Sequence, residues 1–275
     1  MKRVLKSFLM KLLTFSLTRA RKEQGYEPLV LKLENIIPDL KDQYSTFVVE
    51  GKYLETKVRN QHAFQVQLIM DALKPLKELN RDIVVVDIGD SSGNHLIYLN
   101  KLLGNLDTVS VNLDKVAIEK IRSKGLKAIY SYAEDLHNNS EFNKETDIFF
   151  SLEMLEHLEN PTGFLKNMAE RAVCKRFALS VPLINKSRVG LHQIRNMNFD
   201  IPMSPENTHI YELSPDDWDL LFKFSGWKVV KRVKYTQYPR SSYLFFMKYL
   251  WRKLDFDGFY GVILEKDDTY SKRYG

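Results

Sequence analysis

Residues Ile83–Ile88 (IVVVDI) are all β-branched except Asp87, and they lead directly into the turn sequence GDSSG. Such a run is typical of a strand that is buried on both faces. A strand of this kind needs helices on both sides of its sheet, so the stretch predicts a layered α/β domain. Gly89 and Gly93 allow a sharp turn that opens a helix, where unpaired backbone N–H groups and the positive dipole end suit a ligand.

From residue 55 onward the chain alternates between the two element types. Predicted helices cover residues 55–79, 95–103, 116–123, 163–173 and 215–224, and predicted strands cover 83–88, 108–113, 128–130, 147–150, 177–181, 227–233 and 261–264. Such alternation with short links indicates βαβ units, so we expect an α/β fold with a doubly wound, mostly parallel, seven-stranded sheet. Ligands of these sheets bind at the carboxyl ends of the strands, which is where Asp87–Gly93 falls.

The charge of the chain is concentrated at its start. Seven of the 41 lysines and arginines lie in residues 1–22, and no acid precedes Glu23, whereas the remaining 34 basic residues nearly balance 35 acidic ones. The basic character therefore belongs to the N-terminus, and we expect no nucleic-acid partner. Cys174 is the only cysteine and cannot form an intramolecular disulfide, which favours a reduced, cytoplasmic setting.

Residues 1–22 have apolar positions at helical spacing, and these share one half of the helix surface: Val4, Leu5, Phe8, Leu9, Leu12 and Leu13. Lys6 and Lys11 interrupt the apolar run, so it falls short of the roughly 20 residues that a membrane span requires. Three alternatives remain: a basic amphipathic helix on an anionic membrane, a helix packed on its own domain or on a second subunit, and a signal sequence.

A second segment, Ser241–Leu254 (SSYLFFMKYLWRKL), combines aromatic residues with Lys248, Arg252 and Lys253. It suits a membrane interface, a core or a substrate lid. We expect residues 1–54 to form an N-terminal helical extension and residues 55–275 to form the main domain. The expected location is cytoplasmic, with peripheral contact at the inner face of the membrane through residues 1–22.

Several motifs follow the glycine turn in a fixed order: VSVNLDKVAIEKIRSKG, SYAEDL, SLEMLEHLENP and THIYELSPDDWDLLFKFSGWKVV. With DIGDSSG, this series resembles the class I S-adenosylmethionine-dependent methyltransferases, in the branch that has a LEHL-type motif after the fourth strand. The resemblance covers roughly residues 55–266. It implies a Rossmann-like fold, S-adenosylmethionine as cofactor and a methyl acceptor as substrate.

The resemblance also implies roles for individual positions. The methionyl part of the cofactor would lie in the turn (Asp87, Gly89, Asp90, Ser91, Gly93), the ribose and adenine beside the next two strands (Asn112, Leu113, Ala133, Glu134), and the sulfonium over the fourth strand (Ser151, Leu152). The chain departs from the family at Ser91, Asn112 and Tyr132, where a glycine and two acids are usual. We expect a working loop with weaker ribose contacts, the alternative being a non-catalytic relative.

Three residues are candidate catalytic bases for a hydroxyl acceptor: His157, Glu153 and His209. The alternative for His157 is that it only bonds to the backbone and braces the turn. These residues, together with Glu156, also resemble the metal-binding set of small-RNA 2′-O-methyltransferases and ubiquinone-pathway O-methyltransferases. The resemblance therefore implies, as an alternative, a metal-assisted reaction.

A long insertion at about 183–212 follows the fifth strand, and in such folds an insertion at this edge commonly covers the acceptor. Its cations, Lys186, Arg188, His192, Arg195 and His209, suit an acidic acceptor, although it could equally be a solvated loop. The favoured acceptor is a hydroxyl of a lipid-linked sugar or surface glycan. A quinone-type lipid phenol, methylated with or without a metal, and an inactive scaffold on a membrane are the alternatives.

Overall fold

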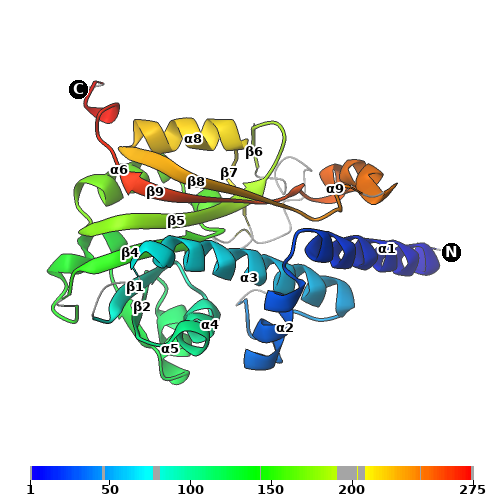
Figure 1. Ribbon diagram of the computed structural model, residues 1–275, viewed down its shortest axis with the longest axis horizontal. Helices are drawn as coiled ribbons and strands as arrows, with labels where there is room; N and C mark the ends of the chain where they lie inside the picture. The colour runs from blue at the N-terminus through cyan, green and yellow to red at the C-terminus, as the bar shows by residue number, and fades with distance from the viewer. Residues whose placement is uncertain are drawn as a thin grey trace.

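A seven-stranded sheet forms the centre of the computed structural model, which describes residues 2–44, 47–76, 81–142, 144–190, 203, 208–241 and 243–273. The strand order is β3-β2-β1-β4-β5-β9-β8 (Figure 1). The strands are β1 (Ile83–Ile88), β2 (Leu106–Asn112), β3 (Lys127–Tyr130), β4 (Thr146–Leu152), β5 (Cys174–Leu183), β8 (Trp227–Thr236) and β9 (Gly258–Lys266). Only β9 runs antiparallel to its neighbours in this sheet. The expected mostly parallel, seven-stranded α/β fold is therefore confirmed.

Helices cover both faces of the sheet. On one face lie α3 (Lys52–Leu73), α4 (Asn94–Leu103) and α5 (Lys115–Ser123), and on the other lie α6 (Pro161–Glu170) and α8 (Pro215–Phe224) (Figure 1). The strands fill both layers because their side chains alternate: Val85 and Phe150 belong to the core under α3, and Val86 and Phe149 belong to the core under α6 and α8.

Among the helices expected from the sequence, two differ most from their expected bounds. The helix expected at 55–79 is α3, which begins three residues earlier, after Gly51 at φ 81°, and ends at Leu73. A 3₁₀ turn, η1 (Lys74–Leu76), follows because Pro75 has no N–H to continue the helical ladder. The helix expected at 163–173 is α6, which begins at Pro161 because the Asn160 side chain accepts a hydrogen bond from the Gly163 N–H and caps it.

Two further helices precede the sheet domain, α1 (Lys2–Glu23) and α2 (Glu27–Ile36). Leu13 and Leu17 of α1 pack with Met247 and Trp251 of α9 (Met247–Leu254), and the two helices lie together at one end of the molecule (Figure 1). The Trp251 indole donates a hydrogen bond to the hydroxyl of Ser16 at 3.1 Å. The second half of α1 is thus packed on its own chain, whereas its first half presents apolar side chains to solvent. Among the described residues, no helix combines the length and the apolar character needed to cross a bilayer.

The remaining elements are short. They are the 3₁₀ turns η2 (Ala133–Asn138), η3 (Leu155–His157), η4 (Tyr243–Phe246) and η5 (Ser271–Arg273), and the two-residue strands β6 (Arg188–Val189) and β7 (Tyr211–Glu212). β6 and β7 pair with each other, and the backbone N–H of Ile210 donates a hydrogen bond to the carbonyl of Glu156 at 2.7 Å. This pairing brings the end of the insertion against η3, at the carboxyl edge of the sheet.

Candidate active site

A cavity of about 1210 Å³ opens at the carboxyl ends of β1, β2 and β4. Its walls come from the turn after β1, the ends of β2 and β4, α3, η3 and the segment between α2 and α3. Single-ligand sites usually measure about 300–1,000 Å³. This cavity therefore has room for a nucleoside cofactor and for part of an acceptor beside it.

The turn after β1 has the backbone that the sequence predicts. Gly89 and Gly93 have φ values of 81° and 76°, where a side chain would be strained. A Cβ on Gly93 would also lie 2.5 Å from the Leu126 side chain. Ser91 keeps a negative φ, and its hydroxyl donates to the carbonyl of Gln43 at 3.0 Å. Serine is therefore accommodated in place of the usual glycine, and it ties the turn to the segment that precedes α3.

That segment, residues 37–50, is held over the turn by further bonds. The Arg59 guanidinium donates to the carbonyls of Ile37 and Pro38 at 2.7 and 2.6 Å. The Asn94 amide donates to the Gln43 side chain at 2.8 Å, and Lys124 forms an ion pair with Asp42 at 2.7 Å. Within the same segment, the rings of Tyr44 and Phe47 stack 4.3 Å apart, and both line the cavity. The described residues of this segment, 37–44 and 47–50, thus form one wall of the site.

Two buried carboxylates lie side by side at the base of the turn. Asp90 Oδ1 accepts hydrogen bonds from the backbone N–H groups of Ser92 and Gly93, both at 2.9 Å. The Oδ2 atoms of Asp87 and Asp90 receive no hydrogen bond from the described residues. Burial, and then the neighbouring Asp90, hold the pKa of Asp87 well above its ordinary value. Two adjacent buried carboxylates share a proton unless a nearby cation neutralises their charge. This part of the cavity wall therefore fits the ammonium group of a methionyl cofactor.

Both the nitrogen and the oxygen of the Asn112 side-chain amide form hydrogen bonds. Its amide nitrogen donates to the carbonyl of Asp90 at 2.8 Å, and its oxygen accepts from the N–H of Asp114 at 2.9 Å. An aspartate could not donate the first of these bonds. Asparagine therefore braces the turn in a way that the usual acid could not, and Asn112 also faces the cavity, where we expected the ribose.

Most of the predicted cofactor residues line the cavity: Asp87, Gly89, Asp90, Ser91, Asn112, Leu113, Ala133, Glu134 and Leu152. Two do not. Gly93 is the N-cap residue of α4, and Ser151 is buried inside β4, where its hydroxyl has no hydrogen-bond partner within the described part of the chain. Both instead have positions that shape the walls of the cavity, and the contacts of all eleven residues with the cofactor remain a prediction.

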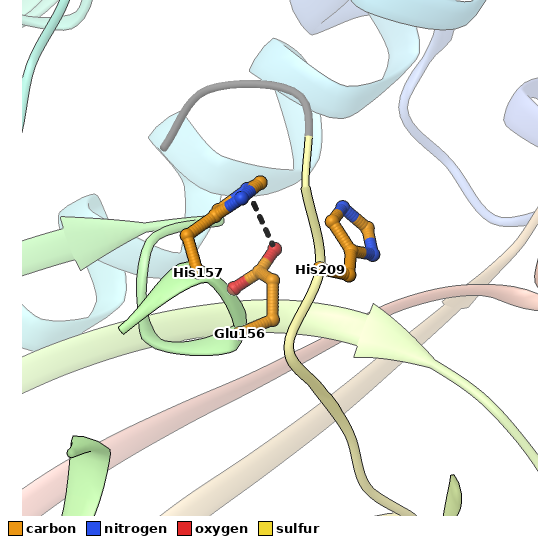
Figure 2. Close-up of side chains that lie close together, drawn as sticks. All are labelled: Glu156, His157 and His209. Atoms are coloured by element: carbon orange, nitrogen blue, oxygen red, sulfur yellow. Dashed lines mark ion pairs between the residues drawn. The ribbon is translucent and has the colours of Figure 1, made fainter. Parts of the chain in front are cut away.

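At the other end of the cavity, Glu156, His157 and His209 converge (Figure 2). One ligand atom from each lies within 4.8 Å of the others. His157 Nδ1 lies 2.9 Å from the carbonyl of Thr208, which can only accept, so Nδ1 carries the proton. His157 therefore makes the backbone contact that a bracing role requires. Its Nε2 is left with a lone pair facing Glu156 Oε1 at 3.9 Å.

Burial shifts the pKa values of Glu156 and His157 in this cluster. Glu156 is fully buried, and neither of its carboxylate oxygens has a hydrogen-bond partner among the described residues. Burial, and then Glu153, raise the pKa of Glu156 well above its ordinary value. Burial, and then the charge of His209, lower the pKa of His157 to about 4. One carboxylate and two imidazoles in this arrangement could hold a divalent cation.

Glu153 ends β4 with a φ of 53°, which is uncommon for a residue other than glycine and is found mostly where the surroundings require it. Its N–H donates to the Ser180 carbonyl at 2.8 Å, and the Ser180 hydroxyl donates to Glu153 Oε1 at 2.7 Å. Gln65 of α3 in turn donates to the Ser180 hydroxyl at 3.2 Å. Burial raises the pKa of Glu153 to about 8, although Ser180 and Lys57 oppose the shift. Glu153 is thus a carboxylate that gains and loses a proton near neutral pH.

The structure adds site residues that the sequence reasoning missed. Lys57, Gln61 and Gln65 of α3 all line the cavity, and Lys57 forms an ion pair with Asp255 and lies 4.7 Å from the ring centroid of Phe256. The sequence does contain a pattern that indicates these three polar residues: they recur every four positions and so share one face of α3. Phe256, which also lines the cavity, had no such signal, because only the packing of α9 brings it there.

The predicted insertion at 183–212 falls largely outside the described residues, including His192 and Arg195. Arg188 is described, and it forms an ion pair with Glu212. Although burial would raise the pKa of Glu212, hydrogen bonds from His209 and Arg188 bring it down to about 2. Arg188 is therefore held by a carboxylate of its own chain, which weakens the expectation that it binds an acidic acceptor.

Comparison with known proteins agrees with this geometry. The family described as a methyltransferase domain matches residues 59–232. Ubiquinone biosynthesis O-methyltransferases from two strains of Rickettsia bellii are 27% identical over 137 residues, which is 47% of this chain and 54% of theirs. The chain thus spans about half the length of these curated relatives.

Two solved structures share the fold. A candidate sarcosine dimethylglycine methyltransferase from Galdieria sulphuraria gives a TM-score of 0.54 at 12% identity, covering 79% of this chain and 88% of that one. The Haloferax volcanii complex of the Trm112 methyltransferase activator with a methyltransferase gives a TM-score of 0.51 at 14% identity, covering 76% of this chain and 93% of that one. The family match over residues 59–232 shows that the chain belongs to the methyltransferase domain family, and the two solved structures share its fold.

Proposed function

We propose that the enzyme methylates a hydroxyl oxygen of a membrane-associated acceptor, with Glu153 as the base. The observation that supports this most directly is that Glu153, which directly follows β4, lines the same cavity as the turn after β1 and the Glu156–His157–His209 cluster. S-adenosylmethionine supplies an electrophilic methyl group. An acceptor hydroxyl attacking it must lose a proton, and Glu153 Oε2 is free of the Ser180 bond and would accept that proton.

The pKa of Glu153 leads to a pH prediction. Below about pH 8 the carboxyl is mostly protonated and cannot act as a base, so turnover should rise with pH to a plateau above 8. Ser180→Ala removes a hydrogen bond that stabilises the charged form, so the rising limb should move to higher pH. We expect turnover at pH 7 to fall roughly threefold to tenfold, with the plateau kept.

Ser110→Ala is the matched control, because Ser110 is also a buried strand serine, but its hydroxyl has no hydrogen-bond partner among the described residues. Its pH profile should coincide with that of the wild type. If Ser180→Ala lowers turnover equally at every pH, the pKa of Glu153 does not control the rate, and Glu153 is not the base.

A lipid-linked sugar or surface glycan is the first candidate acceptor. Lys57 and Gln61 can bond to sugar hydroxyls, and the face of the Phe256 ring suits the apolar face of a sugar ring. The test is to supply methyl-labelled cofactor with lipid-linked sugars and with polyprenylated phenols, and to identify the methyl ether by mass spectrometry. Label in a sugar ether supports this candidate. Label found only on a nitrogen, carbon or carboxylate product would contradict methylation of a hydroxyl.

A quinone-type lipid phenol is the second candidate, and the Glu156–His157–His209 cluster favours it, as does the likeness to the ubiquinone O-methyltransferases. Bound at the cluster, a divalent metal would act as a Lewis acid that makes a nearby hydroxyl more acidic. Here the chain's own contribution is the set of donor atoms: the Glu156 carboxylate, His157 Nε2 and a ring nitrogen of His209.

Titration with Mg²⁺, Mn²⁺ or Zn²⁺ in a calorimeter tests the cluster without turnover. We expect one equivalent to bind, and we expect His157→Ala together with His209→Ala to weaken binding at least roughly tenfold. His137→Ala, remote from the cluster, is the control. Absence of saturable binding, with activity unchanged by a chelator, would leave the cluster as a structural hydrogen-bonding unit.

A further inference from the structure

One side of α1 has apolar side chains that the described part of the chain leaves exposed. Leu5, Phe8 and Phe15 are spaced by three and seven residues, so they share this side of the helix, whereas Leu12 between them is partly buried against the core formed with α9. This side is offset from the one that packs on the rest of the molecule through Leu13, Leu17 and Ala20. Leu5 and Phe8 are 69% and 64% exposed, and Phe15 is also exposed.

The segment from η4 through α9 repeats this arrangement. Met247 and Trp251 are buried against α1, whereas Tyr243, Phe246 and Tyr249 are exposed. Since α1 and α9 lie together at one end of the molecule (Figure 1), both sets of exposed apolar and aromatic side chains occur at that end. We call this end, formed by α1, η4 and α9, the α1–α9 surface.

The charges that residues 5–22 of α1 and α9 carry are all positive. The sequence has no acid before Glu23, and α9 (MKYLWRKL) contains none. Lys248 Nζ lies 4.0 and 4.8 Å from the ring centroids of Phe245 and Tyr249, and the Arg19 guanidinium lies 6.0 Å from that of Phe15. Cations placed over exposed aromatic rings can lie at the depth of lipid headgroups while the rings reach the acyl boundary.

We propose that the α1–α9 surface docks on an anionic lipid bilayer. The charge pattern selects this occupant, because a second copy of the chain on the same surface would place lysines against lysines. A neutral protein partner would leave the cations without counter-charges. Anionic headgroups satisfy the cations, and the acyl boundary takes up the exposed aromatic and aliphatic side chains.

The α1–α9 surface is connected to the acceptor half of the cavity. The Trp251 ring stacks with that of Tyr53 at the start of α3, at a centroid distance of 6.3 Å. Directly after α9, Asp255 forms an ion pair with Lys57, and the Phe256 ring stacks with that of His209 at 6.3 Å. Docking would therefore bring the bilayer close to the acceptor half of the cavity. This step, the delivery of a lipid-linked acceptor, rests on the proposed function, whereas docking itself does not.

Vesicle co-sedimentation tests docking without any turnover. The full chain is mixed with vesicles of phosphatidylcholine alone, or of equal parts phosphatidylcholine and phosphatidylglycerol, at about 0.1 M salt. We expect binding to the anionic vesicles only. Leu5→Ser with Phe8→Ser, and separately Phe246→Ser with Tyr249→Ser, should each lower the partition coefficient at least roughly tenfold. Lys6→Glu with Lys11→Glu should lower it by a similar factor.

The matched control replaces exposed apolar residues elsewhere, Val116→Ser with Leu220→Ser, which are 66% and 64% exposed on α5 and α8. This variant should sediment like the wild type. The proposal is overturned if the wild type stays in the supernatant with anionic vesicles, or if the α1 and α9 variants bind as well as the control. It is also overturned if these variants instead turn a dimer into a monomer in size-exclusion chromatography. Calorimetric binding of S-adenosylmethionine by each variant verifies folding and tests the methyltransferase site independently of the bilayer.

Discussion

Glu153→Gln should lower the rate of methyl transfer by about 10²- to 10⁴-fold, the range that general base catalysis contributes. The glutamine keeps the size of the side chain and can still accept the Ser180 hydrogen bond, but it cannot take a proton from the acceptor. Because Glu153 lies beyond the nucleoside end of the cavity, cofactor affinity should stay within about twofold, measured by calorimetry. The rate is measured in a single turnover with methyl-labelled cofactor, so product release does not mask the loss.

Glu145→Gln is the matched control for this prediction. Glu145 is an exposed acid directly before β4, at the opposite end of the strand that Glu153 terminates. Its substitution should leave the rate unchanged. A Glu153→Gln enzyme that still turns over at a tenth of the wild-type rate or more would assign the proton to another acceptor, with Nε2 of His157 as the next candidate.

Asp87→Asn should weaken the binding of S-adenosylmethionine roughly 10- to 150-fold, because hydrogen bonds to a charged group contribute about 1.5–3 kcal/mol. Asp87 is buried, one of its oxygens has no partner among the described residues, and Asp90 lies beside it. The substitution removes the charge that we expect to hold the cofactor's ammonium group. The dissociation constant is measured by calorimetry at pH 7.5.

The same substitution should not destabilise the fold. Burial and Asp90 already disfavour the ionised form of Asp87, so a neutral amide relieves the repulsion between the two acids. The melting temperature without cofactor should therefore stay the same or rise. Asp82→Asn, an exposed acid at the other end of the same strand, should change neither quantity. Unaltered affinity in Asp87→Asn would show that the methionyl group lies elsewhere.

The sheet domain was predictable because its signals are local. The IVVVDI run gave β1 with both ends correct, and Pro215–Phe224 gave α8 with both ends correct, since an N-capping serine and a following glycine mark the helix. The predicted bounds of the edge strands were less accurate. β8 extends to Thr236, beyond the expected Val233, because its alternating cations are an exposed edge face and carry little apolar pattern.

The site could be predicted only where one motif supplies several residues. The turn after β1 and the LEMLEH stretch each place neighbouring residues on the cavity wall. The Ser180 contact with Glu153, and the arrival of Phe256 beside His209, depend on segments far apart in the sequence. No local pattern encodes such contacts, because they follow from how β4 pairs with β5 and from how α9 packs on α1.

The bond from Ser91 to the Gln43 carbonyl bears on how small a working enzyme could be made. The family match begins at residue 59, yet one wall of the site is supplied by residues before it. A truncated protein cut at that boundary would keep the sheet but lose the partners of Ser91, Asn94 and Lys124. The smallest unit with a complete cavity therefore starts upstream of residue 37, and a cut at residue 59 would remove this wall together with the buried Val30 and Leu33 of α2.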